Sequence, residues 1–132
     1  MNRKRLRILQ RRLESVVEKN YAQTRYYCKD ECGTSACALG HACLIPSFQR
    51  DGLVLGRKSI PKLRRTSLVG EDAAAVFFGI SRDTAYSIFG YGVCTAKRKA
   101  KQIGRLLSMG EDKFSEHREA SDGYRRQRVL SV

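Results

Sequence analysis

The stretch VGEDAAAVFFGISRDTAYSIF, residues 69–89, decides the fold that this sequence predicts. Its apolar residues recur at helical spacing on both sides of Gly79, which indicates two short helices joined by a tight turn. Ala75, four residues before that glycine, is small enough to let the helices cross closely, and Ser81 is suited to cap the second helix. Two side chains of this second helix are expected to pack inward, Ala85 and Ile88.

This pattern fits both a DNA-reading helix-turn-helix and a plain helical hairpin. In the first case the second helix enters a major groove and presents its polar side chains to the bases, namely Arg82, Asp83, Thr84, Tyr86 and Ser87. In the second case the same residues belong to a scaffold. Only Arg82 is basic on the proposed reading helix, so the pattern leaves both interpretations open.

Two amphipathic helices are predicted on either side of the hairpin, at residues 3–19 and 95–109. Each has one narrow apolar stripe, which is typical of a helix that packs on a core. Thr95 is suited to cap the second of them. The inward residues are Leu6, Leu9, Leu13, Val16 and Val17 in the first helix, and Ala96, Ala100, Ile103 and Leu107 in the second. The outward residues are basic: Arg3, Lys4, Arg5, Arg7, Arg11 and Arg12, then Lys97, Arg98, Lys99, Lys101 and Arg105.

The run CGTSACALGHACLIP, residues 32–46, predicts a further helix built from small residues. Thr34 or Ser35 is the expected N-cap, and Pro46 is expected to end the helix. A stripe of small side chains would let another element approach closely, at Ala36, Gly40 and Cys43. Residues 20–32 have no clean period and predict an irregular crossing.

Residues 49–70 mix glycine, proline and charge, which predicts a long basic loop. Within it we expect either a helical turn or a short strand-like pair at 53–55 and 67–69. The fold class is therefore mainly α: a compact single-domain bundle of about four to five helices over residues 1–110. Residues 111–132 are alternately charged and are expected to form a C-terminal extension that frays.

Charge is the strongest indication of function. The chain has 132 residues, with 26 Lys and Arg against 13 Asp and Glu, and its net charge is +13. Such an excess on a small domain attracts polyanions. No segment approaches the roughly 20 apolar residues of a membrane span, and no signal peptide is recognisable, so we expect a cytoplasmic protein without a membrane partner. Five cysteines in such a chain favour reduced thiols.

Four residues have a spacing that a zinc site could use, C-x3-C-x4-C-x3-H at Cys28, Cys32, Cys37 and His41. Buried structural cysteines are the favoured interpretation, and a redox pair is a further alternative. Catalysis by Cys37 with His41 lacks an orienting Asn or Asp, and no phosphate-binding glycine loop occurs. We therefore expect a protein that is not an enzyme and holds no cofactor or metal.

The runs CGTSACALGHACLIPSFQRDGL, AAAVFFGIS, AYSIF and AKQIGRLL together resemble a family of small phage and prophage proteins. That family is marked by a Cys-Gly-Thr-x-x-Cys segment before a small-residue helix, and the resemblance covers about residues 6–107. It implies a compact helical fold and a mobile-element origin, but no particular activity. Relatives often place Trp at His41, which argues against zinc and catalysis. The residues expected to be structural are Cys32, Gly33, Thr34, Cys37, Gly40, His41 and Gly79.

The sequence thus predicts a small basic binding protein for DNA or RNA. Its contacts would come from the two basic helices, from the loop residues Arg57, Lys58, Lys62, Arg64 and Arg65, and from Arg82 and Thr84. One alternative is a phage-encoded protein that binds and inhibits or redirects a host complex which handles nucleic acid. A zinc-binding module is the second alternative.

Overall fold

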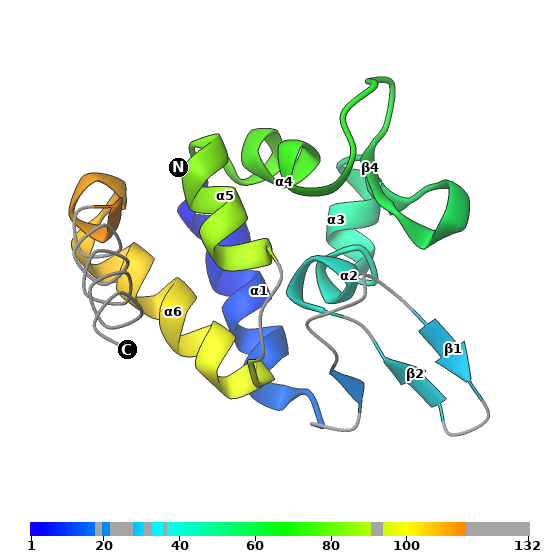
Figure 1. The fold of residues 1–132 in the computed structure, drawn as a ribbon, viewed down its shortest axis with the longest axis horizontal. Coiled ribbons are helices and arrows are strands. Elements are labelled where there is room, and N and C mark those ends of the chain that lie inside the picture. The colour runs from blue at the N-terminus through cyan, green and yellow to red at the C-terminus, as the bar shows by residue number, and fades with distance from the viewer. Residues whose placement is uncertain (18–19, 22–27, 31–32, 36, 91–93, 116–132) are drawn as a thin grey trace, which may run out of the picture.

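Helices make up most of the residues that the structure describes, which confirms the mainly α fold class (Figure 1). The computed structural model describes residues 1–17, 20–21, 28–30, 33–35, 37–90 and 94–115. The helices are α1 Arg3–Ser15, α2 Ala38–Ala42, α3 Pro46–Arg50, η2 Arg57–Ser59, α4 Gly70–Phe78, α5 Arg82–Phe89 and α6 Ala96–Met109. Two small antiparallel hairpins accompany them, β1 Cys28–Asp30 with β2 Gly33–Ser35, and β3 Leu53–Leu55 with β4 Pro61–Leu63.

The predicted hairpin around Gly79 is confirmed. Helix α4 ends at this glycine, which adopts the left-handed conformation (φ 64°), and the amide of Ile80 donates to the carbonyl of Ala75 at 3.0 Å. The hydroxyl of Ser81 caps α5 by accepting from the amide of Thr84 at 3.1 Å. Because glycine reaches this conformation without a steric penalty, only three residues join the two helices, and α5 packs against α4.

The core lies where α1, α4, α5 and α6 meet α2 and α3. Four phenylalanines fill its centre with edge-to-face and stacked contacts, and their ring centroids are 5.0–5.8 Å apart: Phe48, Phe77, Phe78 and Phe89. Both predicted apolar stripes contribute to it. All four inward residues of α6 are buried, as are Leu6, Leu9 and Leu13 of α1. The prediction for Val17 is wrong, since α1 ends at Ser15 and this valine is 58% exposed.

The segment before α3 differs from its prediction in two places. Thr34 and Ser35 belong to strand β2, and the cap of α2 is Cys37, whose sulfur accepts from the amide of Gly40 at 3.5 Å. Pro46 does not merely end a helix, because it occupies the first turn of α3. A proline needs no amide hydrogen there, so the same residue that stops one helix begins the next. Ala36, expected in the small-residue stripe, lies outside the described residues.

The basic loop is shorter and more ordered than predicted. Strand β3 is found at the expected residues, but it pairs with Pro61–Leu63 rather than with 67–69. Val69 instead forms a single bridge with Lys62, on the other edge of β4. The turn between the strands has left-handed backbone at Lys58 (φ 56°) and Ser59 (φ 58°). This is the turn geometry that fits the twist of a two-stranded hairpin.

The first residues of the predicted C-terminal extension contact the core. Residues 111–115 are helical, Phe114 is buried, and a carboxylate oxygen of Glu111 accepts from the amide of Ser81. Residues 116–132 lie outside the described residues. Among the helices that the structure describes, none has the length and apolar character needed to cross a membrane.

Candidate nucleic-acid interface

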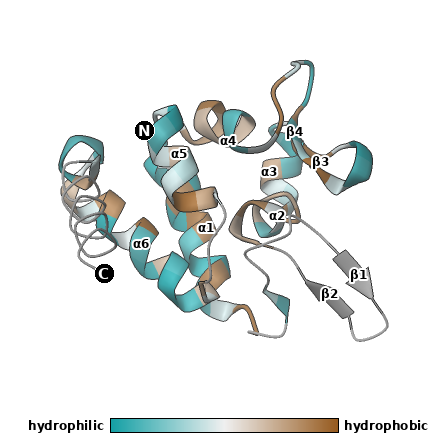
Figure 2. Cartoon of the chain, in the orientation of Figure 1, coloured by the Kyte–Doolittle hydropathy of each residue, from teal (hydrophilic) through white to brown (hydrophobic). Residues whose placement is uncertain are grey.

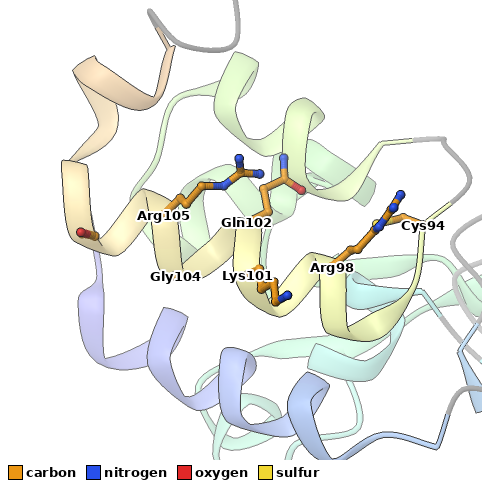
Figure 3. Close-up of a pocket in the computed structure, with 7 residues that line it drawn as sticks. Cys94, Arg98, Lys101, Gln102, Gly104 and Arg105 are labelled. Carbon is orange, nitrogen blue, oxygen red and sulfur yellow. The ribbon is translucent and has the colours of Figure 1, made fainter. Parts of the chain in front are cut away.

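Helices α1 and α6 lie side by side and run in opposite directions (Figures 1 and 3). The guanidinium of Arg3, at the start of α1, donates to the carbonyl of Leu107, near the end of α6, at 2.8 Å. Gly104 faces α1 so closely that an added Cβ would lie 2.8 Å from the side-chain nitrogen of Gln10. Each helix is roughly 20 Å long at 1.5 Å per residue, so the pair forms a surface about 20 Å in length.

The solvent side of this helix pair is strongly cationic. Eight of its side chains are exposed and positively charged: Arg3, Lys4, Arg7 and Arg11 on α1, and Lys97, Arg98, Lys101 and Arg105 on α6. We name them the α1–α6 basic face. The two helices contain one carboxylate, Glu14. Neither ion pair found among the described residues involves any of the eight, although Arg3 donates to the carbonyl of Leu107.

The surface of α6 is hollowed. A depression of about 760 Å³ lies over its outer side, and Arg98, Lys101 and Arg105 are among the residues that line it, with Gln102 and Ser108. Figure 3 shows Lys101 on the side of α6 that faces α1, whereas Arg98 and Arg105 extend on the other side of the helix. The cations therefore surround the hollow, which suits a chain of phosphates better than a single small anion.

Lys99 does not belong to this face, although the sequence predicts that it points outward. It is 6% exposed, and its ammonium donates to the side-chain oxygen of Gln102 at 2.8 Å and to the carbonyl of Ser87 at 3.5 Å. Burial lowers the pKa of Lys99 because the charged form loses hydration. The burial of Lys99 agrees with its position on the helix, because Lys99 lies three residues after Ala96 and four before Ile103, and both of these side chains point inward.

Two arginines of α1 also differ from their prediction. Arg5 is half-buried: its guanidinium donates to the carbonyl of Phe77 at 2.7 Å, lies 4.0 Å from the ring centre of Phe77, and pairs with Asp51 at 3.2 Å. Arg12 is also partly buried, and its Nε has no hydrogen-bond partner among the described residues. Burial lowers the pKa of Arg12. Arg5 joins α1 to α4 and to the end of α3, so it is a structural residue.

Helix α5 does not present the predicted reading residues together. Thr84 is 1% exposed, and its hydroxyl accepts from that of Ser81 at 2.9 Å, so the prediction that it faces a groove is wrong. Arg82 is exposed but pairs with Asp72 of α4 at 3.0 Å and lies over the ring of Tyr86 at 5.7 Å. The turn at Gly79 packs α4 on α5, as both interpretations of the hairpin require, and Arg82, Asp83 and Tyr86 remain exposed on α5.

The five basic loop residues lie at the other end of the molecule from α6 (Figure 1). Arg57, Lys58, Lys62, Arg64 and Arg65 are all exposed, and they surround the β3–β4 hairpin. Figure 2 colours the ribbon at the tip of this hairpin and over much of α6 in the teal of hydrophilic residues, on opposite sides of the view. The sequence places cations on two helices and in this loop, and the structure separates the loop from α6 in space.

Two of the four proposed zinc ligands, Cys37 and His41, have side chains that the structure describes, and each makes another contact. Cys37 caps α2, and His41 donates from Nε2 to the carbonyl of Asn20 at 2.8 Å while its ring stacks on Tyr21. Within the described part of the chain, no three His, Cys, Asp or Glu side chains come close enough to hold a metal. The side chains of Cys28 and Cys32 lie outside the described residues, so the four-residue zinc set stays untested.

Burial also makes the thiols of α2 poor nucleophiles. Loss of hydration raises the pKa of Cys37, and it raises the pKa of Cys43 to about 12. A thiol reacts as the thiolate, so both are held in their unreactive form at neutral pH. The same burial lowers the pKa of His41, with a smaller contribution from the positive charge of Arg12.

Of the residues predicted to be structural, Cys37, Gly40 and His41 are buried in α2 or at its cap, Gly79 forms the α4–α5 turn, and Gly33 and Thr34 belong to strand β2.

Comparison with known proteins adds no family to this description: no family model matches the chain, and no curated protein or solved structure matches it either. The function is therefore inferred from the α1–α6 basic face itself.

Proposed function

We propose that this protein is a binding protein without enzymatic activity and that it binds nucleic acid through the α1–α6 basic face. The observation that carries the proposal is the set of eight exposed cations against the single carboxylate of Glu14, on two helices packed side by side. Charge of one sign over a continuous surface attracts a polyanion and concentrates it there. We place this binding in the cytoplasm; a phage or prophage origin stays a prediction from the sequence.

The face is suited to the backbone of a nucleic acid more than to its bases. Arginine and lysine contact phosphates directly, and hydroxyl and amide side chains such as Ser108 and Gln102 add hydrogen bonds to the same oxygens. Duplex DNA carries about one charge per 1.7 Å, so a face about 20 Å long spans roughly a dozen phosphate charges. We expect an affinity that depends steeply on salt and weakly on sequence.

The test removes one cation from each helix. The variant Arg7→Gln/Lys101→Gln is compared with the wild type for binding to a fluorescent duplex of about 20 base pairs, between about 50 and 200 mM KCl. Each phosphate contact adds about 0.9 to the slope of log affinity against log salt, so we expect the slope to fall by about 2. Fluorescence anisotropy measures both the affinity and the slope.

The matched control is Arg57→Gln/Arg64→Gln, which removes the same charge from the hairpin at the other end of the molecule. We expect this control to keep the wild-type slope. If both double variants lose the same slope, net charge alone explains the binding and the assignment to α1 and α6 is wrong. If the wild type binds poly-L-glutamate but neither duplex nor single-stranded RNA, an acidic protein partner replaces nucleic acid as the ligand.

A further inference from the structure

The β3–β4 hairpin carries a second concentration of charge, which the proposed function leaves unused. Its five exposed cations are Arg57, Lys58, Lys62, Arg64 and Arg65, and we name them the hairpin patch. The one carboxylate within residues 51–65 is Asp51, and this side chain is paired with Arg5 of α1 at 3.2 Å. The positive charge of the hairpin patch is therefore not neutralised by its own segment.

A groove runs beside this patch, between the hairpin and the segment that leads to α4. Its volume is about 560 Å³, and its lining includes the cations Arg57 and Lys62 and the hydroxyl residues Thr66 and Ser67. The hydroxyl of Thr66 is already used, since it donates to the carbonyl of Leu63 at 2.7 Å and accepts from the amide of Leu68 at 3.1 Å. The side chains of Arg57 and Lys62 and the hydroxyl of Ser67 can therefore donate hydrogen bonds to phosphate oxygens in this groove.

The backbone fixes these cations in unusual positions. Every non-glycine residue with positive φ in the described chain lies in this hairpin unit, at Lys58, Ser59 and Arg65. A side chain in left-handed backbone costs about 1 kcal/mol or more, so the surrounding structure must impose it. The amide of Ile60 donates to the carbonyl of Arg57 at 3.2 Å and closes the turn. Lys58 is thus held at the tip of a closed turn.

The hairpin patch lies at one end of the long axis, whereas α6 runs from the middle of the molecule toward the other end (Figure 1). The hairpin packs on α3 and α4, whereas α6 packs mainly on α1 and also on α5. Helices α4 and α5 carry three carboxylates, Glu71, Asp72 and Asp83, against one cation, Arg82, which pairs with Asp72 at 3.0 Å, so they add no positive charge between the two basic surfaces. A phosphate backbone bound along α6 therefore leaves the hairpin patch open to a second one.

We infer that this protein bridges two nucleic-acid segments, with one duplex on the α1–α6 basic face and another on the hairpin patch. This inference rests on the proposed function, because it requires the first duplex to bind as described above. One chain then has two separate polyanion sites and joins duplexes without forming a dimer. On a long nucleic acid, the protein would hold together two parts of that nucleic acid which are distant in its sequence.

The test measures co-capture of two duplexes. A biotinylated duplex of about 30 base pairs is fixed on streptavidin beads, a fluorescent duplex of the same length is added with the protein at about 50 mM KCl, and retained fluorescence is measured. The wild type is compared with Arg57→Gln/Lys58→Asn/Arg64→Gln, in which Asn is chosen because it tolerates left-handed backbone. Circular dichroism verifies that the variant is folded, and light scattering reports the mass of each protein.

We expect the wild type to retain the fluorescent duplex and the hairpin variant to retain on the order of tenfold less, because three phosphate contacts are removed. The affinity of the variant for one free duplex should stay within about twofold of wild type, since the two sites are distant. Equal retention by both proteins, whether or not they are dimers, overturns the inference. So does a wild type that binds a single duplex but retains no second one, and this outcome leaves the proposed function intact. If the wild type binds no duplex at all, the proposed function fails first.

Discussion

Arg5 and Arg7 are the same residue type two positions apart on α1, and they do different work. The guanidinium of Arg5 is committed to the carbonyl of Phe77, to the ring of Phe77 and to Asp51, whereas Arg7 is exposed. The number of basic residues in the sequence is therefore larger than the number of positive charges that a ligand can contact at the surface. The three basic residues that differ in this way are Arg5, Arg12 and Lys99, all placed on the flank or the inner side of their helices.

Replacing Arg5 tests this division. We expect Arg5→Gln to lower the free energy of unfolding by about 1–3 kcal/mol, because a hydrogen bond from a charged donor and a cation–π contact are lost together. Urea unfolding followed by circular dichroism measures the change. The control Arg7→Gln should stay within about 0.5 kcal/mol of wild type, as exposed substitutions usually do. Equal effects of the two variants would show that Arg5 contributes no more than a surface charge.

His41 makes stability depend on pH. Its pKa is lowered by burial, and its Nδ1 has no hydrogen-bond partner among the described residues, so the folded protein holds the ring neutral. In the unfolded chain the pKa returns to about 6.5, and that state takes up the proton first. The stability that His41 contributes is complete above about pH 6.5 and is lost as the pH falls below it, by at most about 1.4 kcal/mol per pH unit.

The measurement is urea unfolding of the wild type at several values between about pH 5 and 7.5, in parallel with His41→Gln. Glutamine still donates to the carbonyl of Asn20 but does not titrate. We expect the variant to lose most of the slope between about pH 5.5 and 6.5, a range in which carboxylates contribute little. A slope that survives in the variant would assign the pH dependence to other groups.

Two glycines in the helical elements differ in what surrounds them. At Gly104 an added Cβ meets only the end of the flexible Gln10 side chain, whereas at Gly90 it would lie 2.4 Å from the backbone oxygen of Tyr86. We expect Gly104→Ala to change stability little or to raise it by up to about 1 kcal/mol, since alanine favours helix. Gly90→Ala should lower it by at least about 1 kcal/mol, because a backbone atom cannot move aside as a side chain can.

Thermal unfolding of the two variants, followed by circular dichroism of the whole chain, gives the comparison. A larger loss in Gly104→Ala than in Gly90→Ala would mean that Gln10 has no alternative position and that the contact between α1 and α6 is tighter than the side chain suggests.

Elements whose signals are local could be predicted from the sequence. Gly79, Ser81 and Thr95 fix helix ends through their own backbone and side chains, so the hairpin and α6 were placed correctly. The partner of β3 could not be predicted, because Pro61–Leu63 does not have a strand-like composition and its pairing depends on the turn at Lys58 and Ser59. The cap of α2 was missed for a similar reason: Thr34 and Ser35 are better caps than Cys37 in isolation, but they pair with β1.

The residues of the candidate site likewise divide into those whose position the sequence predicts and those whose position it does not. Exposure of Arg7 or Lys101 follows from helical phase, and the sequence predicted it. The polarity of Thr84 suggested an outward side chain, but its helical phase places it beside Ala85 and four residues before Ile88, on the buried face of α5, where its hydroxyl accepts from Ser81. That α1 and α6 lie side by side is a long-range contact, which no local pattern specifies.

At the scale of the whole molecule, the net charge is +13, and the exposed cations are concentrated in two places rather than distributed evenly over the surface. The α1–α6 basic face and the hairpin patch hold thirteen exposed cations between them, and the apolar core separates them. Separation limits the repulsion between the two groups, since charges farther apart than a Debye length of about 8 Å are screened at physiological salt. It also means that the two surfaces can be altered independently, which the variants described above exploit.

The packing of α1 against α6 has a consequence for how this chain matures on the ribosome. The apolar stripe of Leu6, Leu9 and Leu13 is synthesised early, but the helix that covers much of it is completed only at Met109. At about 5–20 residues per second, the stripe waits roughly 5–20 s for that partner. Until then, the apolar side of this basic helix is uncovered, and its cations are attracted to the phosphates of the ribosomal RNA beside it. Newly made chains are thus most vulnerable to aggregation, and most in need of a chaperone, before α6 emerges.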